Sequence, residues 1–125
     1  LQPVFIFFCD QKGGNGMIKM IGVEDLDELL PRTDILIADL RTADAYWKYH
    51  IKGAKNYPYD DMEQWEKELL AERRLLLYCE RGSESLMAAR RLNRRNNEVF
   101  TLIGGIKAVY DLEKRNSIDS RGRNR

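Results

Sequence analysis

The sequence has few of the residues that build disulfide scaffolds or metal sites. It contains two cysteines, Cys9 and Cys79, and a single histidine, His50. Two cysteines do not make a disulfide framework, and a lone histidine cannot assemble a metal site. We therefore expect free thiols in a reduced, cytoplasmic protein, with no metal bound.

Long apolar runs and an excess of one charge sign are also absent. No apolar stretch approaches the roughly 20 residues of a membrane-spanning helix, and the burst in LQPVFIFFCD lacks the basic flank of a signal peptide. The formal net charge is +1, so no global field favours nucleic acid or a membrane surface. The 125 residues, of which 43% are hydrophobic and 33% charged, predict one globular domain.

Strand-like and helix-like segments alternate from residue 17 onward. Apolar runs predict strands at residues 19–21, 34–40, 54–57, 75–79 and 98–102. Helical spacing and capping signals predict helices at residues 23–30, 42–49, 60–71, 83–95 and 106–114. This alternation predicts an α/β fold with a parallel sheet that is covered by helices on both faces.

The two ends of the chain differ from this pattern. Residues 1–16 form an N-terminal extension that is either an appended segment or a strand, because VFIFFC, the turn signal KGGNG and MIKMI could make a hairpin. We favour an appended segment, since the alternating pattern is complete without it. Residues 17–115 make the domain, and residues 116–125 read as a flexible polar tail.

Polar residues follow the two most apolar predicted strands. One strand ends in Asp39-Leu40-Arg41 and the other in Cys79-Glu80-Arg81. Because the carboxyl ends of parallel strands meet at one edge of a sheet, where α/β proteins place their sites, we expect a single site that uses both.

Cys79 stands a few residues before a helix, so its loop must turn tightly, and Gly82 provides the backbone freedom. Such a loop, with the helix N-terminus behind it, directs N–H groups at its centre, where they stabilise a thiolate or a bound anion. Arg81 is the nearest cation in the sequence. The alternative is that Cys79 is a small buried hydrophobic residue.

Four motifs in order resemble the rhodanese-like family over residues 19–113. They are DLR (39–41), HIKGAKNYP (50–58), LLLYCERGSES (75–85) with its C-x-x-G-x-x-S loop, and LIGGI (102–106) before the last helix. The resemblance implies a three-layer α/β/α fold with a central, mostly parallel sheet of about five strands.

The resemblance also implies a sulfurtransferase that works without a cofactor. Cys79 takes sulfane sulfur from a donor, carries it as a persulfide and passes it to a thiol or cyanide. Backbone N–H groups of the loop surround the sulfur; the loop residues are Glu80, Arg81, Gly82, Ser83, Glu84 and Ser85. Asp39, Arg41 and His50 support the loop or its neighbouring turn rather than react.

Two departures from the family pattern concern the donor. The fifth residue after the cysteine is often basic or a hydroxyl in this family, whereas here it is Glu84, and Glu80 adjoins the nucleophile. These carboxylates oppose a small dianion such as thiosulfate, so the donor is either a small sulfur compound or a protein persulfide. In the last helix, Val109 stands where the family usually has tryptophan, which concerns packing.

Other functions are weaker alternatives. A phosphatase or arsenate reductase of the same fold uses the loop C-x5-R, but the sixth residue after Cys79 is Ser85, which removes the arginine that clamps the oxyanion. A non-catalytic rhodanese-like module that binds or regulates is the other class. The cluster Arg90, Arg91, Arg94 and Arg95 reads as a solvated helix face, with docking of an acidic protein as the alternative.

Overall fold

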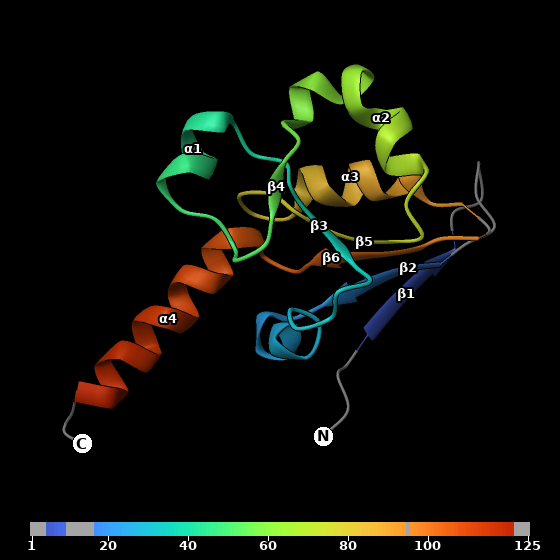
Figure 1. Ribbon diagram of the computed structural model, residues 1–125. Coiled ribbons are helices and arrows are strands. Elements are labelled where there is room, and N and C mark those ends of the chain that lie inside the picture. Colours follow the sequence, from blue (N-terminus) through green and yellow to red (C-terminus); the bar gives the residue numbers. More distant parts are fainter. Residues whose placement is uncertain (1–4, 10–16, 95, 122–125) are drawn as a thin grey trace.

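A six-stranded sheet forms the centre of the molecule (Figure 1). The computed structural model describes residues 5–9, 17–94 and 96–121. The strand order is β1-β2-β6-β5-β3-β4, and every neighbouring pair is parallel except β1 with β2. The strands are β1 (Phe5–Cys9), β2 (Met17–Ile21), β3 (Leu36–Asp39), β4 (Lys55–Asn56), β5 (Arg74–Tyr78) and β6 (Glu98–Leu102).

Helices cover both faces of this sheet, as the alternating sequence pattern predicts. In Figure 1, α2 and α3 lie above the sheet, whereas η1 and α4 lie below it. The 3-10 helices are η1 (Val23–Glu28) and η2 (Tyr59–Asp61), and the α-helices are α1 (Ala43–Lys48), α2 (Met62–Leu70), α3 (Ser83–Leu92) and α4 (Gly105–Arg121). The architecture is therefore three-layered α/β/α with a mostly parallel sheet.

Strand β5 illustrates why the central strands are almost continuously apolar. Leu75 and Leu77 pack in one hydrophobic cluster with α2 and α3, whereas Leu76 and Tyr78 pack in the other with η1 and α4. All four side chains are 0% exposed. A strand that is buried on both faces has no solvent side on which polar residues could alternate.

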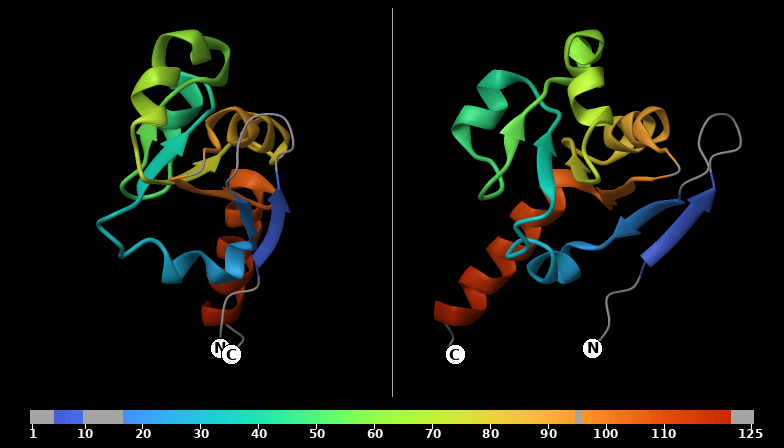
Figure 2. Two further views of the ribbon diagram at one scale, coloured as in Figure 1. Left: turned by 90° about the vertical axis from the view of Figure 1, so that its right-hand side faces the viewer. Right: turned by 45° about the vertical axis from the view of Figure 1, so that its right-hand side comes forward.

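The described part of the N-terminal segment follows the hairpin alternative of the sequence analysis. Phe5–Cys9 pairs antiparallel with Met17–Ile21 in five registered pairs, so the hairpin alternative describes these residues (Figure 2). The added strand satisfies the outer backbone groups of β2, which would otherwise form an open edge. Residues 1–4 and 10–16 lie outside the described part of the chain.

Two helices differ from their predicted form. Helix α4 continues to Arg121 instead of ending at residue 114, because residues 106–121 contain no proline or glycine to stop it. The expected tail at 116–125 is therefore helical as far as Arg121, and residues 122–125 lie outside the description. Residues 23–28 form a 3-10 helix rather than an α-helix, and the three-residue repeat places Leu26 and Leu29 together in the core.

The strand ends that carry polar residues meet at one edge of the sheet. Asp39 is registered against Tyr78, so the residues that follow β3 and β5 are spatial neighbours. This confirms the prediction that the 39–41 and 79–81 segments share an edge.

Candidate active site

Cys79 lies directly after β5, in the turn that leads into α3. Its Sγ accepts hydrogen bonds from the N–H groups of Gly82, at 3.0 Å, and of Ser85, at 3.4 Å. The thiol in turn donates to Ser85 Oγ at 3.6 Å. The residue is only 2% exposed. A sulfur anion at this position would therefore be stabilised by two fixed donors in a nearly dry environment.

Gly82 and Ser85 give the loop its shape. Gly82 precedes α3 with φ +114°, a conformation that other residues rarely adopt, and a Cβ there would lie 3.3 Å from the Gly104 nitrogen. Ser85 is 0% exposed, and its hydroxyl donates to the Gly82 carbonyl oxygen at 3.2 Å. The Ser85 hydroxyl thus joins the two ends of the turn around the sulfur.

The start of α4 fastens the outer side of the same loop. The N–H groups of Ile106 and Lys107 donate to the carbonyl oxygens of Cys79 and Glu80 at 2.9 and 3.1 Å. N–H groups at a helix N-terminus have no partner within the helix, and here they donate to backbone carbonyls of the cysteine loop. Gly105, with φ +66°, allows this approach, since a Cβ there would lie 2.5 Å from both carbonyl oxygens. In the sequence, the Gly-Gly turn is recognisable only as a family motif. Its contact with the cysteine loop is visible only in the folded structure.

Asp39 and Arg41 form a buried ion pair beside the loop. Arg41 Nη2 lies 2.9 Å from Asp39 Oδ2, and the two side chains are 5% and 0% exposed. The Arg41 N–H and the Tyr78 hydroxyl also donate to the carboxylate, at 2.9 and 2.6 Å. Burial lowers the pKa of Arg41, but the hydrogen bonds and charge of Asp39 outweigh it and raise that pKa above its ordinary value. Arg41 therefore stays charged.

Tyr78 is a supporting residue that the sequence analysis missed. Its hydroxyl donates to Asp39 and also accepts the Ile51 N–H at 3.0 Å. Burial, followed by the hydrogen bond to the Asp39 carboxylate, raises the pKa of Tyr78 above that of a free phenol. The one sequence signal was a tyrosine in an otherwise aliphatic buried strand, which needs a polar partner for its hydroxyl.

Arg41 links this buried network to the cysteine loop. Its guanidinium reaches Glu80 Oε1 at 3.8 Å and donates to the Tyr49 carbonyl oxygen. Because the Glu80 side chain is 58% exposed, this second ion pair is weak compared with the one to Asp39. Arg41 thus contacts the loop at Glu80, the residue after Cys79, and Asp39 holds Arg41 from the other side.

The remaining loop residues face solvent. Arg81, Ser83 and Glu84 are exposed. Glu84 lines a small pocket of about 90 Å³ beside the loop, together with Arg41 and Asp60; its other lining residues are Leu40, Thr42, Pro58 and Tyr59.

A family model described as the rhodanese-like domain matches residues 22–112. The chain belongs to the rhodanese-like family. A curated relative, the thiosulfate sulfurtransferase GlpE of Coxiella burnetii, is 33% identical over 92 residues, which cover 73% of this chain and 86% of that protein.

Solved structures with the same fold include two bacterial proteins. Reduced CoADR-RHD from Bacillus anthracis matches with a TM-score of 0.66 at 20% identity, over 77% of this chain and 17% of that one. This chain therefore spans only a small part of that larger protein. A rhodanese homologue from the extremely thermophilic bacterium Thermus thermophilus matches with a TM-score of 0.54 at 28% identity, over 71% and 98% of the two chains.

His50 of this rhodanese-like domain stands apart from the sulfur. Its Nδ1 lies 2.9 Å from the Tyr46 carbonyl oxygen, and its ring stacks on the Tyr46 ring with 3.9 Å between centroids. No described contact joins His50 to the loop of residues 79–85. The histidine holds the turn that follows α1, in agreement with a supporting position.

The arginine cluster lies at the C-terminal end of α3, which ends at Leu92 instead of residue 95, so Arg90 and Arg91 lie on the helix and Arg94 follows it. Arg90, Arg91 and Arg94 are exposed, and Arg91 Nη2 forms an ion pair with Glu66 Oε1 at 2.7 Å. Arg95 lies outside the described residues. One of the cations is therefore already engaged by the domain itself, and docking of an acidic protein at this cluster stays a prediction.

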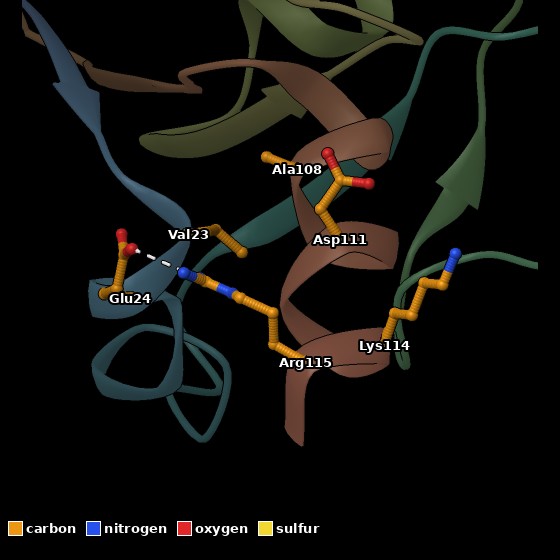
Figure 3. Close-up of a pocket in the computed structure, with 6 residues that line it drawn as sticks. All are labelled: Val23, Glu24, Ala108, Asp111, Lys114 and Arg115. Carbon is orange, nitrogen blue, oxygen red and sulfur yellow. Dashed lines mark ion pairs between the residues drawn. The ribbon is translucent and has the colours of Figure 1, made fainter. Parts of the chain in front are cut away.

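The rhodanese-like domain also has a larger pocket, which opens between η1 and α4 (Figure 3). It has a volume of about 530 Å³ and is lined by Val23, Glu24, Ala108, Asp111, Lys114 and Arg115. An exposed ion pair of 3.8 Å joins Arg115 to Glu24 across it. Its lining has no thiol or hydroxyl side chain. Within the described part of the chain, no helix is long and apolar enough to cross a lipid bilayer.

Proposed function

We propose that the protein is a sulfurtransferase that carries sulfane sulfur as a persulfide on Cys79. The observation that carries the proposal is the placement of Sγ, which accepts two loop N–H groups, from Gly82 and Ser85, in a member of the rhodanese-like family. The relative from Coxiella burnetii is named as a thiosulfate sulfurtransferase, which supports the same reaction class.

The reaction proceeds in two displacements at sulfur. The Cys79 thiolate attacks the outer sulfur of a donor R–S–SH; the donor S–S bond breaks, its electron pair leaves with R–S⁻, and Cys79–S–SH forms. An acceptor thiolate R′–S⁻ then attacks the outer sulfur of this persulfide. R′–S–SH leaves, and Cys79 returns to the thiolate. No net oxidation or reduction occurs, so the cycle needs no redox cofactor.

The loop contributes fixed donors rather than a proton relay. The N–H groups of Gly82 and Ser85 stabilise the sulfur anion before and after each displacement, and they need not reorient because the backbone holds them. The Ser85 hydroxyl can turn from the Gly82 carbonyl toward an anionic sulfur. Arg41 acts as a positioning residue, since it reaches Glu80 of the loop, and Asp39 holds Arg41 in place.

Intact mass spectrometry tests the proposal directly. After incubation with a persulfide donor, the wild-type chain should gain the mass of one sulfur atom and lose it on addition of cyanide. Cys79→Ser should not gain it, whereas Cys9→Ser, the matched removal of the other thiol, should behave as the wild type. If neither the wild type nor Cys9→Ser gains sulfur from any donor, the domain is a non-catalytic binding module.

Phosphatase chemistry has no comparable support. The position that would carry the phosphate-binding arginine is Ser85, which is buried and engaged with Gly82 and Cys79.

A cytoplasmic location is part of the proposal, because a sulfur carrier must regenerate a free thiol in each cycle.

A further inference from the structure

The small pocket beside the cysteine loop suggests which donor the site accepts. We infer that the sulfur donor is uncharged or cationic next to its sulfane sulfur, and that Glu84 and Asp60 select it against oxyanions such as thiosulfate. The inference rests on the proposed sulfur transfer, and it assigns the charge of the substrate.

The pocket lies beside the cysteine loop and shares Glu84 with it. Cys79 is 2% exposed and packs in the same hydrophobic cluster as Leu40, with Tyr59 packed against that cluster. Leu40 and Tyr59 also line the pocket, and Glu84 joins them from the loop itself. A donor that fills the pocket therefore lies beside the loop that holds the sulfur.

The charges around this pocket are mostly negative. Asp60 and Glu84 are exposed carboxylates in its lining, and Arg41 is the one basic side chain in that lining. Arg41 is already paired with buried Asp39 at 2.9 Å and reaches Glu80 at 3.8 Å. The positive charge of Arg41 is thus already balanced by the Asp39 carboxylate in the absence of substrate.

Arg81 adds one exposed positive charge to the same loop, but it is not among the residues that line the pocket. An incoming dianion therefore meets two carboxylates with no unmatched cation in the described lining. A donor with a neutral or ammonium group meets no such repulsion. In a water-like medium, the two carboxylates together should change the rate about fivefold for each unit of donor charge.

A matched series of persulfides tests this charge preference. Aminoethyl, hydroxyethyl and carboxyethyl persulfides have similar size and carry a positive, neutral or negative group. We expect kcat/KM for sulfur transfer to fall in that order, about fivefold at each step. Activity with thiosulfate should rise with ionic strength, because salt screens the repulsion.

Two isosteric substitutions at exposed positions should remove the preference. In the double variant Glu84→Gln, Asp60→Asn, the three persulfides should react at similar rates and thiosulfate activity should rise by about tenfold or more. Glu28→Gln is the matched control, since it removes one exposed carboxylate from η1, which packs on the opposite face of the sheet. It should keep the wild-type order.

Reaction with methanethiosulfonates provides a readout that does not depend on turnover. In a Cys9→Ser background, Cys79 is the one thiol left in the chain. The aminoethyl-to-sulfonatoethyl rate ratio should exceed the ratio for a small free thiol, whose own charge also favours the cationic reagent, and the double variant should lower it to that value.

Equal or reversed rates for the charged pairs in the wild type would overturn the inference, as would an unchanged order in the double variant. If the wild type forms no persulfide with any donor but keeps the methanethiosulfonate preference, the proposed function fails while the charge selection stands. If it forms persulfide and prefers thiosulfate, the function stands and the charge selection fails.

Discussion

Gly105→Ala tests whether the start of α4 holds the cysteine loop in place. Gly105 has φ +66°, and a Cβ on it would lie 2.5 Å from the carbonyl oxygens of Cys79 and Glu80. The substitution therefore imposes two separate costs on the folded state. A left-handed backbone costs an alanine about 1–2 kcal/mol. The steric overlap with rigid backbone costs about 1–3 kcal/mol more, as overpacked sites do.

Gly53→Ala separates these two costs. Gly53 also has a left-handed backbone, with φ +90°, but a Cβ there would touch only Ile37 Cδ1 at 3.9 Å. It should therefore lose about 1–2 kcal/mol of unfolding free energy, from the backbone alone. The effect of alanine on the unfolded chain is the same in both variants and cancels in their difference.

The overlap at Gly105 should also reduce activity. To relieve it, the carbonyls of Cys79 and Glu80 must move away from α4, and the hydrogen bond from Ile106 then weakens. A shift of about 1 Å in a reacting group costs roughly 100-fold in rate. Gly105→Ala should therefore form the persulfide about 100-fold more slowly, while Gly53→Ala stays close to the wild type.

Urea unfolding, followed by tryptophan fluorescence, measures the stability of the two variants, and the rate of mass gain measures sulfur transfer. Gly105→Ala should be less stable than Gly53→Ala by about 1–3 kcal/mol at an unchanged m-value. Equal stabilities, together with a wild-type rate for Gly105→Ala, would refute the reasoning that close backbone approach positions the loop.

Three further predictions concern the hydrogen bonds of Tyr78, Tyr49 and Ser85. Tyr78→Phe should lower the unfolding free energy in urea by about 1–3 kcal/mol, because it leaves the Ile51 N–H buried without its acceptor and removes a donor from Asp39. Burial and the hydrogen bond to Glu113 raise the pKa of Tyr49 to about 12, so the stability that this tyrosine contributes should be fully present below pH 10 and should be lost as the pH rises toward 12. Phenolate absorbance and urea midpoints measure this loss, and a urea midpoint that stays flat between pH 10 and 12 would contradict it. Ser85→Ala should slow persulfide formation about tenfold and cost about 1 kcal/mol, whereas an unchanged rate would show that the hydroxyl does not support the sulfur.

The sequence was sufficient for the layers of the fold and for the loop. Buried strands are readable because β5 has apolar residues at successive positions, and the loop is readable because the thiol and Gly82 stand between a strand and a helix. These signals depend on adjacent residues, so they can be read without knowledge of the tertiary contacts. The predicted helix 42–49 is likewise local, since the Thr42 side chain accepts the Ala45 N–H and caps α1.

Features that depend on distant partners were decided only by the tertiary structure. The outer edge of β2 selected the strand Phe5–Cys9, although the pattern of the domain was complete without it. The role of Tyr78 depends on Asp39, which is far away in the sequence but lies opposite it on the neighbouring strand β3. Likewise, Gly105 matters because α4 returns to the carbonyls of Cys79 and Glu80.

The sequence by itself thus determined the order of strands and helices from residue 17 onward, the edge of the sheet that carries the candidate site and the thiol at its centre. The tertiary structure decided what holds that thiol and what charge lines the pocket beside its loop. The physical reason is that a strand or a loop is specified by neighbouring residues. Hydrogen bonds, ion pairs and pockets instead form between residues that only folding brings together, as the ion pair of Arg41 with Glu80 and the pocket lined by Glu84 and Asp60 show.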